Sequence, residues 1–334
     1  MSRTWSRPVV ALLGLSLAAV LVVLASIRFG AVSLTTSEVF SILRGGGGAT
    51  DRFIVLSLRL PRAALAILVG GGLALSGAVF QALLRNPLAE PYILGISGGA
   101  AFGAVVVLAT GWMSVSSVAL PIAAIMGAAI AILLVFGVAF SADRRMDVRV
   151  LLLAGVVVGA FFSACIALIL SLADAPTVRS AVLWMMGSLS GASWRGVAVV
   201  ATYTIPVALL LLTLARPLNL LAIGEETAAY LGTDVERAKR LAYGAASVIA
   251  AAGVAFAGVI GFVGLIIPHG IRLILGADHR FLLPLSFIAG AGFLALADLL
   301  ARTVVAPAEI PVGVITAFVG VPFFLLLLRR SLGS

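Results

Sequence analysis

The sequence predicts an all-α polytopic membrane protein with about ten transmembrane helices. Of its 334 residues, 62% are hydrophobic and only 10% are charged, whereas soluble domains carry roughly 25% charged residues. The apolar residues form continuous runs of about 20 residues, the length that one helix needs to cross a bilayer, and not the alternating pattern of a membrane β-barrel. The 36 glycines suit helices in lipid, where small residues let backbones approach closely.

Ten segments have the length and composition of a span, and we treat residues 1–334 as one transmembrane domain. The first run follows Arg3 and Arg7 and lacks a small-residue cleavage site, so we expect a retained anchor. The run 241–275 is too long for one ordinary helix and short for two, and we divide it near Ala257 and Gly258. The expected spans are 8–28, 61–83, 92–110, 118–140, 150–172, 196–214, 241–257, 258–275, 283–301 and 312–328.

The distribution of basic residues predicts the orientation. With the N-terminus inside, fourteen of the 22 Arg and Lys residues face the cytosol, and basic residues are enriched on that side of a membrane. This arrangement puts both termini in the cytosol and the loops 29–57 and 173–195 outside. The second loop contains a candidate short helix, 178–189, that could lie across the mouth of a pathway.

One long charged segment, 216–240, interrupts the apolar runs with RPLNLLAIGEETAAYLGTDVERAKR and contains four of the thirteen acids and the only lysine. We expect a short amphipathic helix here. Its apolar side would consist of Leu220, Leu221, Ile223, Ala228 and Leu231. A helix that a membrane protein presents to the cytosol usually contacts a partner, which favours a permease driven by a soluble subunit.

The composition argues against several other classes. Two histidines and the single Cys165 offer no metal cage or disulfide, and no Walker A motif or nucleophile–base pair is present. We therefore expect no metal, no cofactor and no enzymatic activity in this chain. The arginines are scattered at helix ends, so we expect contact with membrane lipid and not with nucleic acid.

Two polar motifs have competing interpretations. Arg85 to Pro91, RNPLAEP, breaks the apolar pattern with two prolines, and broken backbone near membrane depth is tolerated where it lines a cavity or packs in protein. It is either a pore-lining turn or a plain tight turn. Arg59 and Arg62 are three apart and share a helical face, where they could hold an acidic partner or reach lipid phosphates.

Acids inside the spans are sparse. Asp298 and Arg302 have the i, i+4 spacing of an intrahelical ion pair, and Glu309 precedes Pro311, where it could cap the last helix. A secondary transporter or channel that works alone would need paired acids or histidines in the membrane, which the chain largely lacks. A structural scaffold would leave the charged segment unexplained.

These segments together resemble the permease subunits of bacterial importers for cobalamin, ferric siderophores and haem, the FecCD-type family of type II ABC importers. The pattern is most similar to that of the cobalamin permeases. The resemblance covers most of residues 58–325. The matching stretches are LRLPRAALAILVGGGLALSGAVFQALLRNPLAEPYILGISGGAAFG, VLLLAGVVVG, VLWMMGSLSGASWR, LNLLAIGEETAAYLG, GVIGFVGLIIPHGIRLILGADHR and ADLLARTVVAPAEIPVGVITAFVGVPFF.

The resemblance implies a permease of the bacterial inner membrane that works as a homodimer by alternating access, with the pathway between its two copies. Two cytosolic ATPase subunits bind the ATP, and a periplasmic or lipid-anchored protein delivers an iron–siderophore or a corrinoid, with haem as the alternative. Matched positions imply three sites. The binding-protein docking site is Arg59, Arg62 and Arg302; the cytoplasmic gate is Asn86, Leu88, Asp147 and Val148; the ATPase coupling helix is Leu221 to Gly232, including Gly224, Glu225, Glu226, Ala228 and Leu231. An Asp at 147 departs from the small hydroxyl residues of cobalamin permeases, and it could instead pair with Arg144, Arg145 or Arg149.

Overall fold

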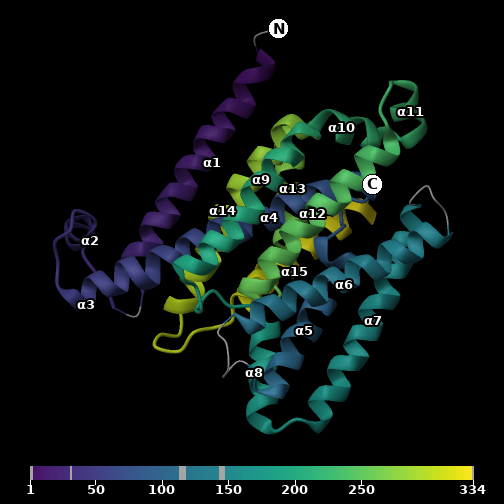
Figure 1. Ribbon diagram of the computed structural model, residues 1–334. Helices are drawn as coiled ribbons and strands as arrows, with labels where there is room; N and C mark the ends of the chain where they lie inside the picture. Colours follow the sequence, from purple (N-terminus) through teal and green to yellow (C-terminus); the bar gives the residue numbers. More distant parts are fainter. Residues whose placement is uncertain (1–2, 31, 113–117, 143–146, 333–334) are drawn as a thin grey trace.

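The computed structural model describes residues 3–30, 32–112, 118–142 and 147–332, and within these ranges the chain is helical and contains no strand (Figure 1). The elements are α1 (Arg3–Arg28), α2 (Thr36–Leu43), α3 (Ala49–Arg52), the π-helical η1 (Phe53–Arg59), α4 (Leu60–Leu83), the 3-10 helix η2 (Pro91–Leu94), α5 (Ile96–Thr110), α6 (Ala119–Ala142), α7 (Val148–Leu172), α8 (Ala175–Met185), α9 (Trp194–Thr213), α10 (Ala215–Ile223), α11 (Glu225–Tyr230), α12 (Val235–Ala257), α13 (Val263–Leu275), α14 (His279–Thr303) and α15 (Val312–Leu332).

The predicted polytopic architecture is confirmed. In the described residues, seven helices are long and apolar enough to cross a membrane, and three shorter apolar helices, α5, α13 and α15, fall on the other expected spans. The run 241–275 divides where we placed the boundary, because α12 ends at Ala257 and α13 begins at Val263. The expected short helix in 178–189 is α8, which begins earlier because Asp174 caps it.

Helix α4 forms the centre of the bundle, with nearly all of its residues buried. It packs against α14 at a glycine pair: a Cβ added to Gly70 would lie 2.4 Å from the carbonyl oxygen of Gly290, and one added to Gly290 would lie 2.4 Å from that of Gly70. Only glycine permits this approach. The contact fixes the register, so that Arg62 and Asp298, each about 12 Å along its own helix from the glycine pair, arrive side by side.

A second close approach joins α4 to α13. A Cβ on Gly77 would lie 1.9 Å from the carbonyl oxygen of Gly264. The link between α12 and α13 is a sharp break, in which Gly258 and Phe262 both have positive φ values, 68° and 69°. The side chain of Glu90, from the turn after α4, accepts a hydrogen bond of 2.6 Å from the Phe262 N–H. This contact satisfies a donor at the start of α13 that the helix itself leaves free.

Side-chain caps define the start of several helices, since the first N–H groups of a helix have no partner inside it. These caps set helix bounds that the hydrophobic pattern alone leaves open. The capping residues are Thr35 for α2, Asp147 for α7, Asp174 for α8, Ser193 for α9, Asp234 for α12 and Asp278 for α14.

The bundle has two distinct ends (Figure 1). Helices α10 and α11 lie at one end, which we call the α11 end, and α2, α3 and α8 lie toward the opposite end, which we call the α8 end. Helix α1 stands at the edge of the bundle and packs on α14, with most of its apolar side chains exposed. Such a face suits contact with lipid.

Candidate functional site

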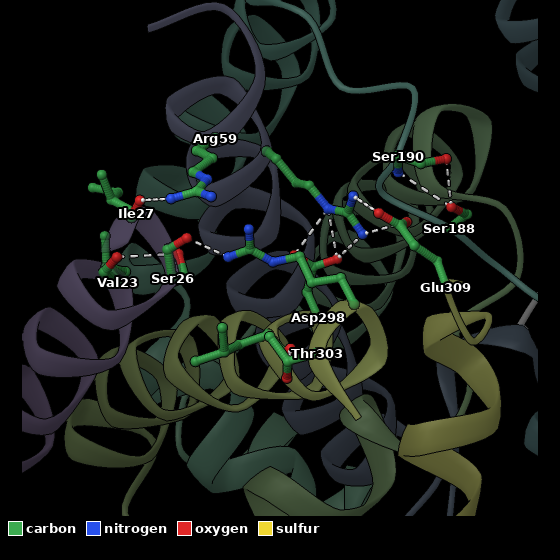
Figure 2. Close-up of polar contacts among 12 residues, drawn as sticks. Val23, Ser26, Ile27, Arg59, Ser188, Ser190, Asp298, Thr303 and Glu309 are labelled. Carbon is green, nitrogen blue, oxygen red and sulfur yellow. Dashed lines mark hydrogen bonds and ion pairs between the residues drawn. The ribbon is translucent and has the colours of Figure 1, made fainter. Parts of the chain in front are cut away.

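A cluster of ionised side chains lies at the α8 end, where α4 begins and α14 finishes. The Arg62 guanidinium binds two carboxylates at once (Figure 2). Its Nε donates to both oxygens of Asp298 at 2.9 and 3.0 Å, and its Nη1 and Nη2 donate to the two oxygens of Glu309 at 3.0 Å each. Planar two-pronged contacts of this kind are among the strongest in proteins. The Asp298 side chain is 3% exposed, whereas that of Glu309 is 42% exposed.

The other two predicted docking arginines lie inside the protein. Arg59 Nη1 donates to the carbonyls of Ile27 and Arg28 at 2.8 and 2.7 Å, and these carbonyls belong to the last turn of α1, where helical partners are missing. Arg302 donates to the Ser26 carbonyl (Figure 2), and its Nε lies 3.6 Å from Asp298. Both side chains are buried, because the end of α1 covers them.

Arg59 and Arg62 line the same cavity but bind different elements. Arg59 is the last residue of the π-helical segment η1, and α4 begins at Leu60. The Arg59 guanidinium binds carbonyl groups at the end of α1, while Arg62 binds Asp298 of α14. The interpretation of Glu309 as a cap for the last helix is replaced by its contact with Arg62.

The three arginines of the expected docking site come together in the structure. Arg59, Arg62, Arg302 and Glu309 line one cavity of about 300 Å³, together with Ser190 from the loop after α8. Three guanidinium groups meet two carboxylates here, and the hydrogen bonds of Arg59 go to carbonyl groups. The cavity therefore has an excess of positive charge. Asp298 is held by two arginines, which fits an ion pair and not a proton relay.

The charged segment at the α11 end is divided among α10, α11 and the start of α12, so the single amphipathic helix that we expected there is a wrong prediction. Gly224, with φ 158° and ψ 147°, separates α10 from α11. The break turns the apolar residues to different sides. Leu221 and Ala228 are buried in this chain at 3% and 0% exposure, whereas Ile223, Tyr230 and Leu231 are exposed at 71%, 91% and 57%.

Charged side chains of this segment hold it to the bundle. Lys239 of α12 is 2% exposed, and its Nζ lies 3.1 Å from Glu225 at the start of α11 and 3.5 Å from Glu236. Of the two adjacent glutamates, Glu225 therefore faces inward, and Glu226 is exposed. Gly232, with φ 79°, forms the turn that leads from α11 toward α12.

The residues of the predicted gate occupy two turns. Arg85, Asn86 and Pro87 are exposed and Leu88 is half-buried, and the Asn86 side chain accepts a hydrogen bond of 2.9 Å from the Leu88 N–H. Asp147 accepts one of 2.7 Å from the Arg149 N–H and caps α7, and Val148 begins that helix. Arg144 and Arg145 lie outside the described residues. Within the described part of one chain, no hydrogen bond or ion pair joins the two turns.

Two polar side chains that the sequence did not single out connect separate elements. Gln81 of α4 donates to the Ala89 carbonyl at 3.4 Å and to the Gly264 and Leu265 carbonyls at 3.2 Å, and it accepts from Arg272 at 2.9 Å. Asn219 of α10 contacts the first turn of α14. The only sequence signal for either residue was a polar side chain inside or beside an apolar run. The spacing of residues along the sequence does not reveal the partners of such a side chain.

A second cavity, of about 520 Å³, lies between the end of α8, the α12–α13 link and α15. It is apolar, and its lining includes Met186, Val259, Phe262, Gly313 and Phe318. Phe318 is 75% exposed. The cavity offers an apolar wall.

Comparison with known proteins agrees with this architecture. The model of the FecCD transport family matches residues 17–330. The chain is 45% identical over 287 residues to the cobalamin import system permease protein BtuC of Halobacterium salinarum, covering 86% of this chain and 76% of that protein. It is 40% identical over 321 residues to the hemin transport system permease protein HmuU of Yersinia pestis, covering 93% of each.

Two further relatives extend the likeness to nearly the full chain. The uncharacterized ABC transporter permease protein YvrB of Bacillus subtilis is 39% identical over 330 residues, covering 96% of this chain and 93% of that protein. A solved structure described as an inward-facing conformation of a putative metal-chelate type ABC transporter superposes with a TM-score of 0.85 at 33% identity, covering 96% of this chain and 98% of the other.

Proposed function

Because this chain belongs to the FecCD transport family and is a permease subunit of an ABC importer, we propose that it moves an iron–siderophore or a corrinoid across the bacterial inner membrane by alternating access. Haem is the alternative substrate. The proposal is supported by relatives whose names specify cobalamin and hemin import. Both termini would lie in the cytoplasm, as the distribution of Arg and Lys favours.

We further propose the assembly that the family resemblance implies. Two copies of the chain form a homodimer with the pathway between them, two cytosolic ATPase subunits bind and hydrolyse ATP, and a periplasmic or lipid-anchored protein delivers the substrate. The cavity beside α15 has an apolar lining. This lining supports a pathway whose wall binds the substrate only weakly. A large substrate held without dedicated charged ligands can leave as easily as it enters.

The exposed side chains at the α11 end are the observation that carries this proposal. Ile223, Tyr230 and Leu231 are large apolar residues, each more than half exposed, on a segment that lies beyond the apolar spans. Exposed apolar side chains that gather on one surface mark interaction sites. We assign this surface, with Glu226, to the ATPase contact; Leu221, Gly224, Glu225, Ala228 and Gly232 shape and anchor it from behind.

The arginine cavity supports the proposed docking site in a modified form. Glu309 in its lining is half-exposed, while Arg59, Arg62 and Arg302 contribute positive charge. A carboxylate of the delivery protein would meet an excess of positive charge, which mainly raises the association rate and sets orientation. The gate proposed at Asn86, Leu88, Asp147 and Val148 would form where the turns of two copies face each other.

Binding of the ATPase tests the assigned surface. We expect Ile223→Arg and Tyr230→Arg to reduce co-purification of the ATPase subunit about tenfold, as for an interface residue worth 1–2 kcal/mol, while the permease stays helical and monodisperse. Tyr230→Phe is the matched control, because it keeps the apolar ring, and it should bind normally. Unchanged binding by both arginine variants would show that α10 and α11 are only a solvated connection.

A further inference from the structure

Asn219 joins α10 to the first turn of α14 through all of its side-chain polar atoms. Its Nδ2 donates to Asp278 Oδ1 at 2.8 Å. Its Oδ1 accepts from the His279 backbone N–H at 2.8 Å and lies 2.6 Å from His279 Nδ1. The atom that accepts from the His279 backbone N–H must be the amide oxygen, so the orientation of the Asn219 amide is fixed. Because this oxygen cannot donate, His279 has its proton on Nδ1.

The partners of Asn219 are structural groups at a corner between two helices. Asp278 caps α14 by accepting from the Arg280 N–H at 3.0 Å, and His279 is 2% exposed. Helix α13 ends at Leu275, so only Gly276 and Ala277 separate it from the Asp278 cap. A side chain that holds the beginning of α14 therefore also holds the end of α13.

Helix α13 is attached in turn to the turn that contains Asn86 and Leu88. Gln81 binds the Ala89 carbonyl and the Gly264 and Leu265 carbonyls of α13. Glu90, at the end of the same turn, accepts from Phe262 at the start of α13. The turn and α13 are thus connected at two points, and they can shift together more easily than they can separate.

We propose that Asn219 is a positioning residue that couples the ATPase-contacting segment to α13 and, through it, to the gate turn. This inference rests on the proposed function of α10 and α11. When the segment moves with the ATPase, the Asn219 hydrogen bonds carry the α13–α14 corner with it. Without them, α10 can slide past α14, and the movement no longer reaches the α13–α14 corner through this contact. The connection consists of directional hydrogen bonds, so it has a defined position that apolar packing alone would not impose.

A reversal of the hydrogen bond tests this role. Asn219→Asp places a carboxylate against that of Asp278 and breaks the contact, since neither group can donate. Asp278 Oδ1 accepts from both Asn219 and the Arg280 N–H, so the rescuing side chain must accept and donate from one atom. Combining Asn219→Asp with Asp278→Ser meets this need, because a hydroxyl can accept from the Arg280 N–H and donate to the carboxylate at position 219, and serine is a preferred helix cap. The His279 donors still find an oxygen at position 219. We therefore expect the single Asn219→Asp variant to be uncoupled and the double variant to be rescued.

The readout is the movement of the gate turn and not transport of a chosen substrate. In a Cys165→Ser background, a nitroxide at Leu88→Cys reports the distance between the two copies in the ATPase-bound complex, with and without ATP. Asn219→Asp should still hydrolyse ATP, but the fraction of complexes that change distance should fall about fivefold, as expected for the loss of one net hydrogen bond. Asp174→Asn, a change of another helix cap at the α8 end, controls for a weakened helix start.

The outcomes separate this inference from the function on which it rests. If Asn219→Asp responds to ATP as the unsubstituted chain does, or if the double variant is not rescued, Asn219 has only a local structural role and the proposal is wrong. If the unsubstituted chain binds no ATPase and shows no response to ATP, the proposed function itself fails. A loss of response that Asp174→Asn reproduces also overturns the proposal, because it indicates general destabilisation.

Discussion

The two carboxylates that bind Arg62 should differ greatly in their contribution to stability. Asp298 is 3% exposed and lies between Arg62 at 2.9 Å and Arg302 at 3.6 Å, whereas Glu309 is 42% exposed and contacts Arg62 alone. Asp298→Asn and Glu309→Gln remove one negative charge each with little change of shape. The pair therefore compares the same change, on the same arginine, at two degrees of burial.

The expected magnitudes follow from this burial. Two unit charges about 4 Å apart attract by roughly 4 kcal/mol at an effective dielectric constant of 20, and loss of one partner from a buried pair typically costs about 3–5 kcal/mol. Asp298→Asn leaves Arg59, Arg62 and Arg302 with only Glu309 as a counter-charge. The contact of Glu309 with water limits its ion pair to about 1 kcal/mol or less.

Titration with SDS in mixed micelles, followed by loss of helical circular dichroism, measures the free energy of unfolding of each variant. We expect Asp298→Asn to lower it by about 3–5 kcal/mol and Glu309→Gln by at most about 1 kcal/mol. Equal effects of the two substitutions would refute the reasoning, since burial would then not decide the strength of these contacts. A neutral Asp298→Asn would show that the arginines find other partners.

Two further predictions concern other parts of the molecule. Gly77→Ala should destabilise the bundle by about 1–3 kcal/mol, because its Cβ would lie 1.9 Å from the Gly264 carbonyl oxygen. The control Gly244→Ala, whose Cβ would meet nothing within 4 Å, should be neutral or stabilising in the same titration. The reverse order of the two effects would contradict the packing. Burial raises the pKa of Asp278, but hydrogen bonds from the Arg280 N–H and Asn219 outweigh it and lower the pKa below its ordinary value. The ionised Asp278 therefore stabilises the fold above its unfolded pKa of about 4, and this stabilisation is lost as the pH falls through the lower folded pKa. The free energy of unfolding of the unsubstituted chain should exceed that of Asp278→Asn by more at pH 7 than at pH 3.

The hydrophobic pattern was sufficient to predict the helices but not their contacts. Continuous apolar runs of about 20 residues have few alternatives in a bilayer, and the ten expected segments correspond to helices. The Arg62–Asp298 contact joins residues 236 apart in sequence. It depends on the register of α4 on α14, which the Gly70 and Gly290 approach sets, and no local spacing contains that register.

The charged segment shows where a signal was present and was misinterpreted. We expected one short amphipathic helix within 216–240, although Gly224 is followed at once by Glu225 and Glu226, and acidic residues are typical of the first turn of a new helix. The break at Gly224 moves Ile223 and Leu231 off the buried side. By contrast, nothing local could predict the Asn219 contact with Asp278, because the two residues are 59 positions apart.

At the α11 end two polar side chains face inward while several large apolar side chains are exposed. The Glu225 carboxylate faces inward to the buried Lys239, and Asn219 faces Asp278, while Tyr230 is 91% exposed. The two inward contacts attach α11 to α12 and α10 to α14, so the segment is fixed to two separate helices. A surface connection with no partner would expose its charges and bury its apolar groups. This arrangement instead gives a firmly attached segment with an apolar outer face, which is what an element needs if a partner is to hold it and move the helices behind it.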